Sequence, residues 1–387
     1  MGLMGADQFE IAVNLLKLIV IFLAMVQLVP ILVWAERRGS AFIQNRLGPN
    51  RVGPLGLLQL LADAIKFIFK EQFIPANAKP FLFKAAPVIA LVPAALAFAA
   101  IPLSTPVEVS TFELFGRAWG PYVFEIQTVH MNVGIIYILG VSSLGAYGLL
   151  TAGWASGNKY SLLGALRACA QMVSYELALG LSIVGALILY GTFSLNEMVQ
   201  LQEGPLAFAW FGKQVTVGWL PNWGIIFQPL GAVLFLTAAF AESNRLPFDL
   251  PEAEGELVAG FHTEYGGFKM LLFFMGEYGH MLVSSALFVI FFLGGYGIPF
   301  LTQDTVFQSL LNNGFSPTVS SLLTSLVFLI SFLMKVFFFL WFFIWVRWTL
   351  PRFRYDKLMD LGWKTMLPWG LMNLFVTAIA VYVMNRG

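Results

Sequence analysis

Long apolar runs recur from one end of this chain to the other, and they constrain its fold more than any other feature. An α-helix of about 20 apolar residues crosses the hydrocarbon core of a bilayer, and each run is close to that length. The sequence therefore predicts an all-α polytopic membrane protein in which residues 1–387 form a single integral membrane domain. We expect about eight transmembrane helices, over residues 11–34, 81–103, 131–153, 162–190, 225–241, 269–297, 322–346 and 366–384.

The composition agrees with a membrane protein and excludes several kinds of site. Hydrophobic residues make up 58% of the chain and charged residues 11%, whereas soluble domains are about 25% charged. A single cysteine forms no disulfide framework and cannot hold an iron–sulfur cluster through thiolates. The three histidines lack the spacing of metal ligands, so we predict no metal site. The net charge of +1 argues against nucleic acid as a partner.

Lysine and arginine are distributed unevenly over the segments that join the predicted spans. The segments after the first, third, fifth and seventh spans hold 17 of the 22 basic residues, and the opposite side holds three. Because positively charged loops stay in the cytoplasm, both termini are predicted to lie outside. The first span follows an acidic N-terminus and lacks a small-residue cleavage site, so we expect a retained helix rather than a signal peptide. No internal repeat is visible, which gives no support to an inverted-repeat transporter.

The first cytoplasmic loop, residues 35–80, contains a second kind of helical pattern over Leu57–Phe73. Apolar residues recur at helical spacing on one side of this stretch, and Asp63, Lys66 and Lys70 fall on the other. This pattern predicts an amphipathic helix lying in the membrane interface. Such a helix could roof an opening that a long apolar ligand enters from the bilayer. It could equally be a connector with a membrane-anchoring helix, and the sequence alone leaves both interpretations open.

A second loop, residues 241–268, is densely acidic although long apolar runs lie on both sides. Charge next to hydrocarbon is costly, so we predict that this loop forms a protonatable antechamber to a membrane conduit. Asp249 followed by Glu252 also resembles a helix-capping box, which accounts for those two residues and not readily for the others. Glu252 and Glu256 are one helical turn apart and would titrate as a coupled set. The loop holds six of the 21 acidic residues: Glu242, Asp249, Glu252, Glu254, Glu256 and Glu264.

Three ionisable residues fall inside predicted spans: Glu176, Glu277 and Lys335. Charged groups at membrane depth are functional candidates by default. They could pair as a structural lock, or they could form a proton relay, because burial raises the pKa of a carboxyl and lowers that of a lysine. His280 lies three residues after Glu277 and faces roughly the same side of a helix, where it could be only a hydrogen-bond partner.

Five stretches of the chain closely resemble the H subunit of bacterial NADH:quinone oxidoreductase (respiratory complex I), the counterpart of mitochondrial complex I subunit 1. They are AERRGSAFIQNRLGPNRVGPLGLLQLLADAIKFIFKE, QMVSYELALG, AESNRLPFDLPEAEGELVAGFHTEYGGFKM, MGEYGHM and WVRWTLPRFRYDKLM. The resemblance covers nearly the whole length of the chain. The external loop 191–224 is longer than we expect for this family.

The resemblance implies a membrane subunit of the bacterial inner membrane that couples reduction of a quinone such as ubiquinone to proton translocation. Its partners would be the other membrane subunits and the peripheral-arm subunits beside the terminal iron–sulfur cluster, which also carry FMN; this chain would bind no cofactor. The quinone chamber would be bordered by Glu36, Arg37, Asp63, Arg245 and Phe248. The proton relay would comprise the six loop carboxylates with Glu176, Glu277 and Lys335. Docking of the peripheral arm or of lipid headgroups would fall to Arg347, Arg352 and Arg354.

Other functions stay open at this stage. The same fold could serve in a membrane-bound hydrogenase or another quinone-free complex, and the chain could be a freestanding ion transporter or a passive scaffold. The intramembrane acids argue against a scaffold. The chain has no ligand set for a cluster or haem and no G-x-G-x-x-G phosphate loop, so we expect it to carry out no redox step itself.

Overall fold

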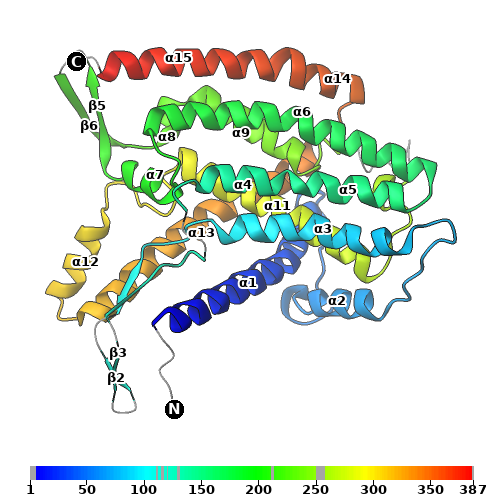
Figure 1. The fold of residues 1–387 in the computed structure, drawn as a ribbon, viewed down its shortest axis with the longest axis horizontal. Coiled ribbons are helices and arrows are strands. Elements are labelled where there is room, and N and C mark those ends of the chain that lie inside the picture. The colour runs from blue at the N-terminus through cyan, green and yellow to red at the C-terminus, as the bar shows by residue number, and fades with distance from the viewer. Residues whose placement is uncertain are drawn as a thin grey trace.

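The computed structural model describes residues 6–385, apart from 110–111, 115–116, 120, 129–130, 211–212 and 250–257. Its described part is a bundle of long helices with short strands at one end (Figure 1). Within that part, seven helical segments are long and apolar enough to cross a membrane: Val13–Ile43, Pro80–Ala99, Gly134–Ala155, Lys159–Tyr190, Phe268–Phe292, Pro317–Thr349 and Tyr355–Val383. The prediction of an all-α polytopic membrane protein is confirmed.

The elements follow one another along the chain in a simple order. The helices are α1 (Ala6–Ile43), α2 (Gln59–Phe69), α3 (Pro80–Ala99), α4 (Gly134–Ser142), α5 (Leu144–Ala155), α6 (Lys159–Tyr190), α7 (Leu195–Leu201), α8 (Gly224–Phe227), α9 (Pro229–Glu242), α11 (Phe268–Phe292), α12 (Gln303–Asn312), α13 (Pro317–Thr349), α14 (Tyr355–Asp360) and α15 (Leu367–Asn385). Short 3₁₀ turns occupy Pro54–Gly56 and Gly260–His262, and a π-helical segment, Leu361–Met366, joins α14 to α15.

The fifth predicted span, residues 225–241, is divided into α8 and α9. Gln228 separates them with a non-helical backbone (φ −129°, ψ 52°), because a residue before proline avoids the helical region. Pro229 then begins α9, where its missing N–H leaves no helical hydrogen bond unmade. At 14 residues, α9 is about 21 Å long and is shorter than the helices that can span alone.

Two helices extend beyond the predicted spans, toward the side that the basic residues predict to be cytoplasmic. The first predicted span ends at residue 34 and the seventh at residue 346, whereas α1 continues to Ile43 and α13 to Thr349. Hydropathy reports only the apolar part of a helix, and the charged turns that follow contain no proline that would end it. Glu36, Arg37 and Arg347 therefore project from rigid helical turns rather than from loops.

The helix α11 lies at the centre of the bundle. Within its most apolar window 89% of the residues are buried in the protein, against 17% for α1. Figure 1 shows α1 and α15 at opposite edges, and α1 begins at the same end of the bundle at which α15 finishes. The α11 side chains that reach the site are consequently enclosed by protein, while α1 keeps one face toward the surroundings.

The two loops predicted to be external contain short antiparallel hairpins that the all-α prediction did not include. One loop pairs β1 (Val107–Val109) with β4 (Tyr122–Phe124) and β2 (Phe112–Leu114) with β3 (Arg117–Trp119). The other pairs β5 (Pro205–Trp210) with β6 (Lys213–Pro221). Their β-branched and aromatic residues favour extended backbone. The backbone N–H of Glu108 donates to Ser321 Oγ at 2.7 Å, which anchors the first hairpin on α13.

Candidate functional site

A cavity of about 710 Å³ lies between α1, α2, α11 and the segment that follows α9. Pockets of about 300–1,000 Å³ are typical of ligand sites. Most of the wall is apolar, from Val26, Val29, Pro30, Ile31 and Val33 of α1, from Leu57, Leu60, Leu61, Ala64 and Phe67 in and before α2, and from Leu271, Phe274 and Met275 of α11. A long apolar molecule would meet hydrocarbon over most of its length here.

Charged side chains gather at one part of this cavity around Glu36. The carboxylate of Glu36 is buried on the part of α1 that extends beyond the predicted span. It accepts hydrogen bonds from the hydroxyl of Tyr278 on α11 and from the guanidinium of Arg347 on α13. A second guanidinium, that of Arg245, lies 3.5 Å from it. Four segments far apart in the sequence therefore converge on one carboxylate.

Arg245 links two acids that sequence reasoning had assigned to different roles. One of its terminal nitrogens lies 3.5 Å from Glu36 Oε2, and the other lies 3.5 Å from Glu277 Oε2. Its guanidinium carbon stands 4.0 Å from the ring centroid of Tyr278, in a cation–π arrangement. Burial opposes the charge of Arg245, but attraction to Glu277, Tyr278 and Glu36 outweighs it and raises the pKa of the guanidinium. The positive charge at this end of the cavity is fixed.

The ion pair between Arg37 and Asp63 joins α1 to α2 beside the cavity. The two side chains approach to 2.5 Å and both line the pocket. Gln59, one turn before Asp63, donates to its other carboxylate oxygen at 2.9 Å. Since both members of the pair are partly exposed, the bond is worth at most about 1 kcal/mol and can open and close readily.

Phe248 and Asp249 lie at the C-terminal end of the segment after α9, and their contacts fix that end. Asp249 lines the cavity and pairs with Arg352 at 2.9 Å. Phe248 packs behind it, with its ring centroid 5.5 Å from those of Tyr175 and Phe353. Phe248 was predicted to border the quinone chamber, and it is not among the described residues that line this cavity.

A second, smaller cavity of about 40 Å³ adjoins the large one. Asn244, Phe274 and Glu277 line both cavities. Its other polar lining residues include Glu242 at the end of α9 and His280 on α11. A space of this size has room for water, and the acids and the histidine in its largely apolar lining supply the polar partners that a buried water needs. Protonatable groups thus continue from the charged end of the large cavity toward the interior of the bundle.

A sequence model of the NADH dehydrogenase family matches residues 16–378 of this chain. The chain belongs to the NADH dehydrogenase family. The H subunit of the NADH-quinone oxidoreductase of Bdellovibrio bacteriovorus is 64% identical over 380 residues, which are 98% of this chain and 99% of that protein. An H subunit of the same enzyme from Geobacter metallireducens is 45% identical over 368 residues, covering 95% of this chain and 96% of that protein. The resemblance found in the sequence is confirmed.

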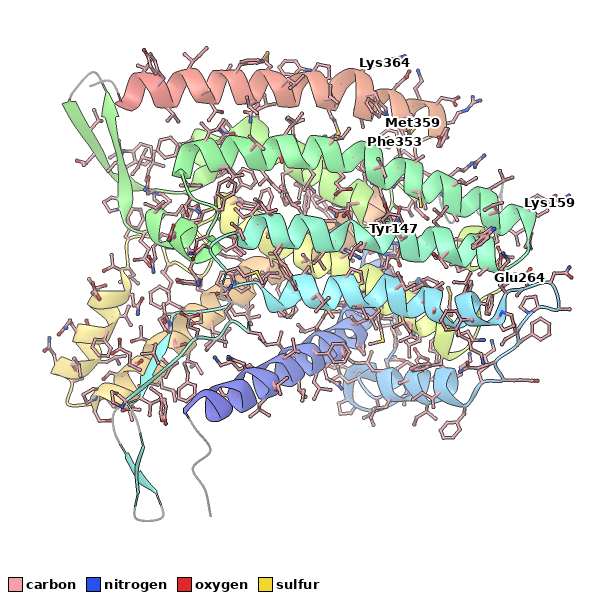
Figure 2. The ribbon with its side chains drawn as sticks, in the orientation of Figure 1. Tyr147, Lys159, Glu264, Phe353, Met359 and Lys364 are labelled. Carbon is pink, nitrogen blue, oxygen red and sulfur yellow. The ribbon has the colours of Figure 1, made fainter. Side chains whose placement is uncertain are left out.

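The other predicted relay residues of this NADH dehydrogenase chain lie in different surroundings. Glu176, on α6, is within electrostatic range of Glu242. Glu264 accepts a hydrogen bond of 2.7 Å from the amide of Asn158 at the α5–α6 turn, beside Lys159 in Figure 2. Lys335 donates to the carbonyls of Leu293, Gly295 and Gly297 at 2.6–2.9 Å, beyond the end of α11. Outside the described residues lie Glu252, Glu254 and Glu256.

Several site residues were missed or were given another role from the sequence. Arg347 was predicted to dock the peripheral arm or lipid headgroups, and the structure places it on Glu36 instead. Arg352 was given the same role, and it pairs with Asp249. Tyr278 follows Glu277 directly in MGEYGHM, and a phenol beside an intramembrane acid was a usable signal. Within the described chain, no group of three His, Cys, Asp or Glu side chains is placed to hold a metal ion.

Proposed function

We propose that this chain is the membrane subunit in which a proton-translocating NADH:quinone oxidoreductase receives its quinone. The observation that carries the proposal is the large cavity, apolar along α1 and α2 and charged around Glu36 and Arg245. A lipid quinone has the same division, with a long isoprenoid tail and a polar ring. The tail would lie along the apolar wall, and the ring would face the charged end.

The charged end suits the chemistry of a quinone being reduced. Two-electron reduction creates a dianion-like species that must take up two protons. The fixed positive charge of Arg245 favours such a species, because opposite charges attract strongly where water is scarce. The hydroxyl of Tyr278 and the carboxylates of Glu36 and Glu277 supply proton-exchanging groups at the same place.

The smaller cavity would carry the change in charge into the membrane. Glu277 borders both cavities, Glu242 lies in the second, and Glu176 lies near Glu242. Coupled buried acids respond to a nearby charge by exchanging protons among themselves. We propose that reduction of the quinone is transmitted along this series. The relay would also include Asp249, Glu264 and the carboxylates between them, and the part of Lys335 in it stays a prediction.

The proposal implies partners that supply the electrons. We infer that this chain binds no redox cofactor and that FMN and iron–sulfur clusters belong to peripheral-arm subunits docked on its cytoplasmic side. Other membrane subunits would receive the proton relay. The setting would be the bacterial inner membrane, with both termini on the periplasmic side, as the distribution of basic residues predicts. The relatives named above are all NADH-quinone oxidoreductase subunits, so a hydrogenase subunit, a freestanding transporter or a scaffold is not favoured.

Substitution of Glu277 and Glu176 by glutamine tests the relay in the assembled complex. Glutamine keeps the shape of the side chain and removes the titratable proton. Both variants are expected to lower quinone turnover and proton pumping together, while reduction of a water-soluble artificial acceptor by NADH is unchanged. Proton pumping at full stoichiometry in the double variant would remove the relay from the proposal.

A photoreactive quinone analogue with a long tail tests the chamber itself. It is expected to label residues of α1, α2 and α11 in the complex, and natural quinone in excess should compete with the labelling. Labelling confined to other subunits would contradict the placement of the quinone in this cavity.

A further inference from the structure

Gln171 is a fully buried amide in the first half of α6, and its carboxamide faces the segment that leads out of α9. The side-chain nitrogen Nε2 lies 2.8 Å from the carbonyl oxygen of Ala241 and 2.7 Å from that of Phe248. A third acceptor, Asn244 Oδ1, lies at 3.3 Å. The nitrogen carries two hydrogens, so each of the two carbonyls receives one.

The two carbonyls stand at opposite ends of the segment 242–248. Ala241 immediately precedes Glu242, which lines the small cavity, and Phe248 immediately precedes Asp249, which lines the large one. Arg245 lies between them. One buried side chain therefore fixes the distance between the two ends of the segment that borders both cavities. We name these two hydrogen bonds the Gln171 clamp.

The same face of α6 contacts the segment a second time. Tyr175 follows Gln171 by four residues and so projects from the same side of the helix. Its ring packs on Phe248 with centroids 5.5 Å apart, and its hydroxyl donates to the carbonyl of Leu358 at 2.9 Å. Glu176, the carboxylate in the membrane, is the next residue on α6. The helix that carries this acid is thus attached directly to the segment that carries the chamber residues.

The segment has little internal structure of its own to keep this shape. Asn244 has a positive φ of 50°, which disfavours continuation of α9. The backbone makes a turn in which the N–H of Phe248 donates to the carbonyl of Arg245 at 2.8 Å. A carbonyl at each end would lose a partner without Gln171, although Ala241 also accepts from the backbone of Asn244.

We propose that Gln171 is a positioning residue, which holds Glu242 and Arg245 in register with Glu176 so that a displacement of the chamber wall reaches α6. This inference rests on the proposed function. It assigns to a neutral amide the mechanical connection between the quinone chamber and the intramembrane acid. Gln171 is not among the residues that line either cavity. Its effect on quinone turnover must therefore pass through the segment 242–248.

Three substitutions in the assembled complex test the clamp. Gln171→Met keeps the length and loses both hydrogen bonds. Gln171→Asn keeps the amide but is one methylene shorter, so it cannot reach both carbonyls. We expect kcat/KM for a long-tail quinone to fall about tenfold or more in Gln171→Met, through a raised KM as well as a lowered kcat, and less in Gln171→Asn. Reduction of an artificial acceptor should be unchanged in both.

Gln171→Glu adds a second measurement, the pH dependence of quinone turnover, which a change in packing alone would not alter. A neutral carboxylic acid can donate one hydrogen bond to one carbonyl, whereas a carboxylate donates none and repels both. Burial disfavours the charged form of a carboxyl, so the fraction of neutral acid should grow as the pH falls. Relative to the unsubstituted complex, quinone turnover of Gln171→Glu should rise as the pH falls. Gln171→Met should show no such change with pH.

Gln202 supplies a matched control at the external end of the bundle. It is also a buried glutamine, and its Nε2 donates to the carbonyls of Ile290 and Met198 at 2.7 and 3.1 Å. Its Oε1 also accepts from the N–H groups of Gly224 and Gly294, so Gln202→Met should destabilise the chain at least as much as Gln171→Met and leave the quinone KM unchanged. If Gln202→Met raised the KM as Gln171→Met does, a general loss of stability would explain both and the clamp would be rejected.

Arg245→Met separates failure of the clamp from failure of the proposed function. Unchanged quinone turnover in Arg245→Met would contradict the chamber itself. Reduced turnover in Arg245→Met, together with unsubstituted kinetics and pH profile in the Gln171 variants, would overturn only the clamp. Should Gln171→Met fail to assemble, the kinetics of Gln171→Asn and the pH profile of Gln171→Glu decide the question by the same criteria.

Discussion

Arg245 combines burial with a charge that its neighbours balance. Its charge is almost completely enclosed, yet it is balanced by Glu36 and Glu277 and lies over the ring of Tyr278. A buried charge is tolerated only when it is paired in this way. The cluster can then hold a positive charge next to an apolar tunnel without unfolding it.

The separate contacts of its two terminal nitrogens predict that lysine cannot replace Arg245. A single ammonium cannot reach Glu36 and Glu277 from one position in the way that the planar guanidinium does. We expect Arg245→Lys to lower quinone turnover about tenfold or more, with artificial-acceptor reduction retained. Steady-state NADH oxidation, measured once with quinone and once with the artificial acceptor, gives both rates. Arg38→Lys is the control, because that guanidinium lies over the ring of Trp34 at 5.6 Å; an equal loss in both variants would contradict the prediction.

A substitution at Gly145 is predicted to narrow the small cavity without replacing any charged residue. A Cβ at this position would come within 2.8 Å of Nε2 of His280, so Gly145→Ala must displace the imidazole, and both residues line the small cavity. We expect the number of protons pumped per electron to fall, because the space for water is reduced. Gly140→Ala is the matched control, since a Cβ there would meet nothing within 4 Å. Proton and electron fluxes measured together in sealed vesicles decide the outcome.

At the scale of single elements, α2 has two apolar sides with different surroundings. Leu60 and Phe67 line the cavity, whereas Ile65 and Ile68 are more than half exposed. An exposed apolar side on an amphipathic helix is expected to rest in the membrane interface. The helix would therefore be held by lipid on one side while it roofs the cavity with the other.

This arrangement predicts that a charge on the lipid side of α2 disturbs quinone binding indirectly. In Ile65→Glu we expect the KM to rise about threefold or more for quinones with long tails and less for short-tail analogues, because the roof loses its anchor. Lys66→Gln, on the neighbouring polar side, should change neither. Equal KM increases for long and short quinones in Ile65→Glu would show that the tail path is not involved.

Lys335 joins α13 to the end of α11. Its ammonium donates to three carbonyls beyond α11, at Leu293, Gly295 and Gly297, and it lies 5.1 Å from the ring centroid of Trp223. All three of its donors are thereby used. This environment is that of a helix-capping lysine, which stabilises the carbonyl end of a helix.

The contacts of Lys335 predict that its removal affects stability more than pumping. Lys335→Met leaves three carbonyls without their donor and should cost roughly 3 kcal/mol, visible as a lower temperature at which the subunit leaves the purified complex. Lys335→Arg should retain most of that stability. A fall in protons pumped per electron with unchanged thermal stability would instead favour the relay role.

At the scale of the whole molecule, the two ends of the bundle differ in their chemistry. The charged cavity and α14 lie at one end, and the β-hairpins and α12 at the other (Figure 1). In Figure 2, Lys364 and Met359 are labelled at the α14 end of the uppermost helical segment. The cavity that the proposed function assigns to the quinone is therefore at the opposite end of the bundle from the hairpins.

Cysteine labelling tests the predicted orientation directly. The native Cys169 is replaced by serine, and single cysteines are introduced as Thr305→Cys on α12 and Lys357→Cys on α14; both positions are exposed. An impermeant maleimide added to intact spheroplasts should label position 305 and should reach position 357 only after permeabilisation. The reverse pattern would place both termini in the cytoplasm.

Local features of the sequence were enough to predict the fold class and the family. In the described part of the chain, seven long apolar helices are where the runs predicted them, because membrane insertion depends on hydropathy over about 20 adjacent residues. The division of the fifth span at Gln228 and Pro229 was not predicted, since the hydropathy of 225–241 is continuous. The external hairpins were missed because their pairing joins segments across a turn.

The sequence by itself determined that the chain crosses a membrane, that it belongs to its family and that its acids are concentrated beside and inside apolar helices. Only the tertiary structure decided which charges meet. Glu36 and Arg347 are 311 positions apart, and Gln171 reaches a carbonyl 77 positions away. Partners at such separations are set by how α1, α6, α11 and α13 pack against one another, and packing depends on the shapes of all the side chains between them rather than on any local pattern.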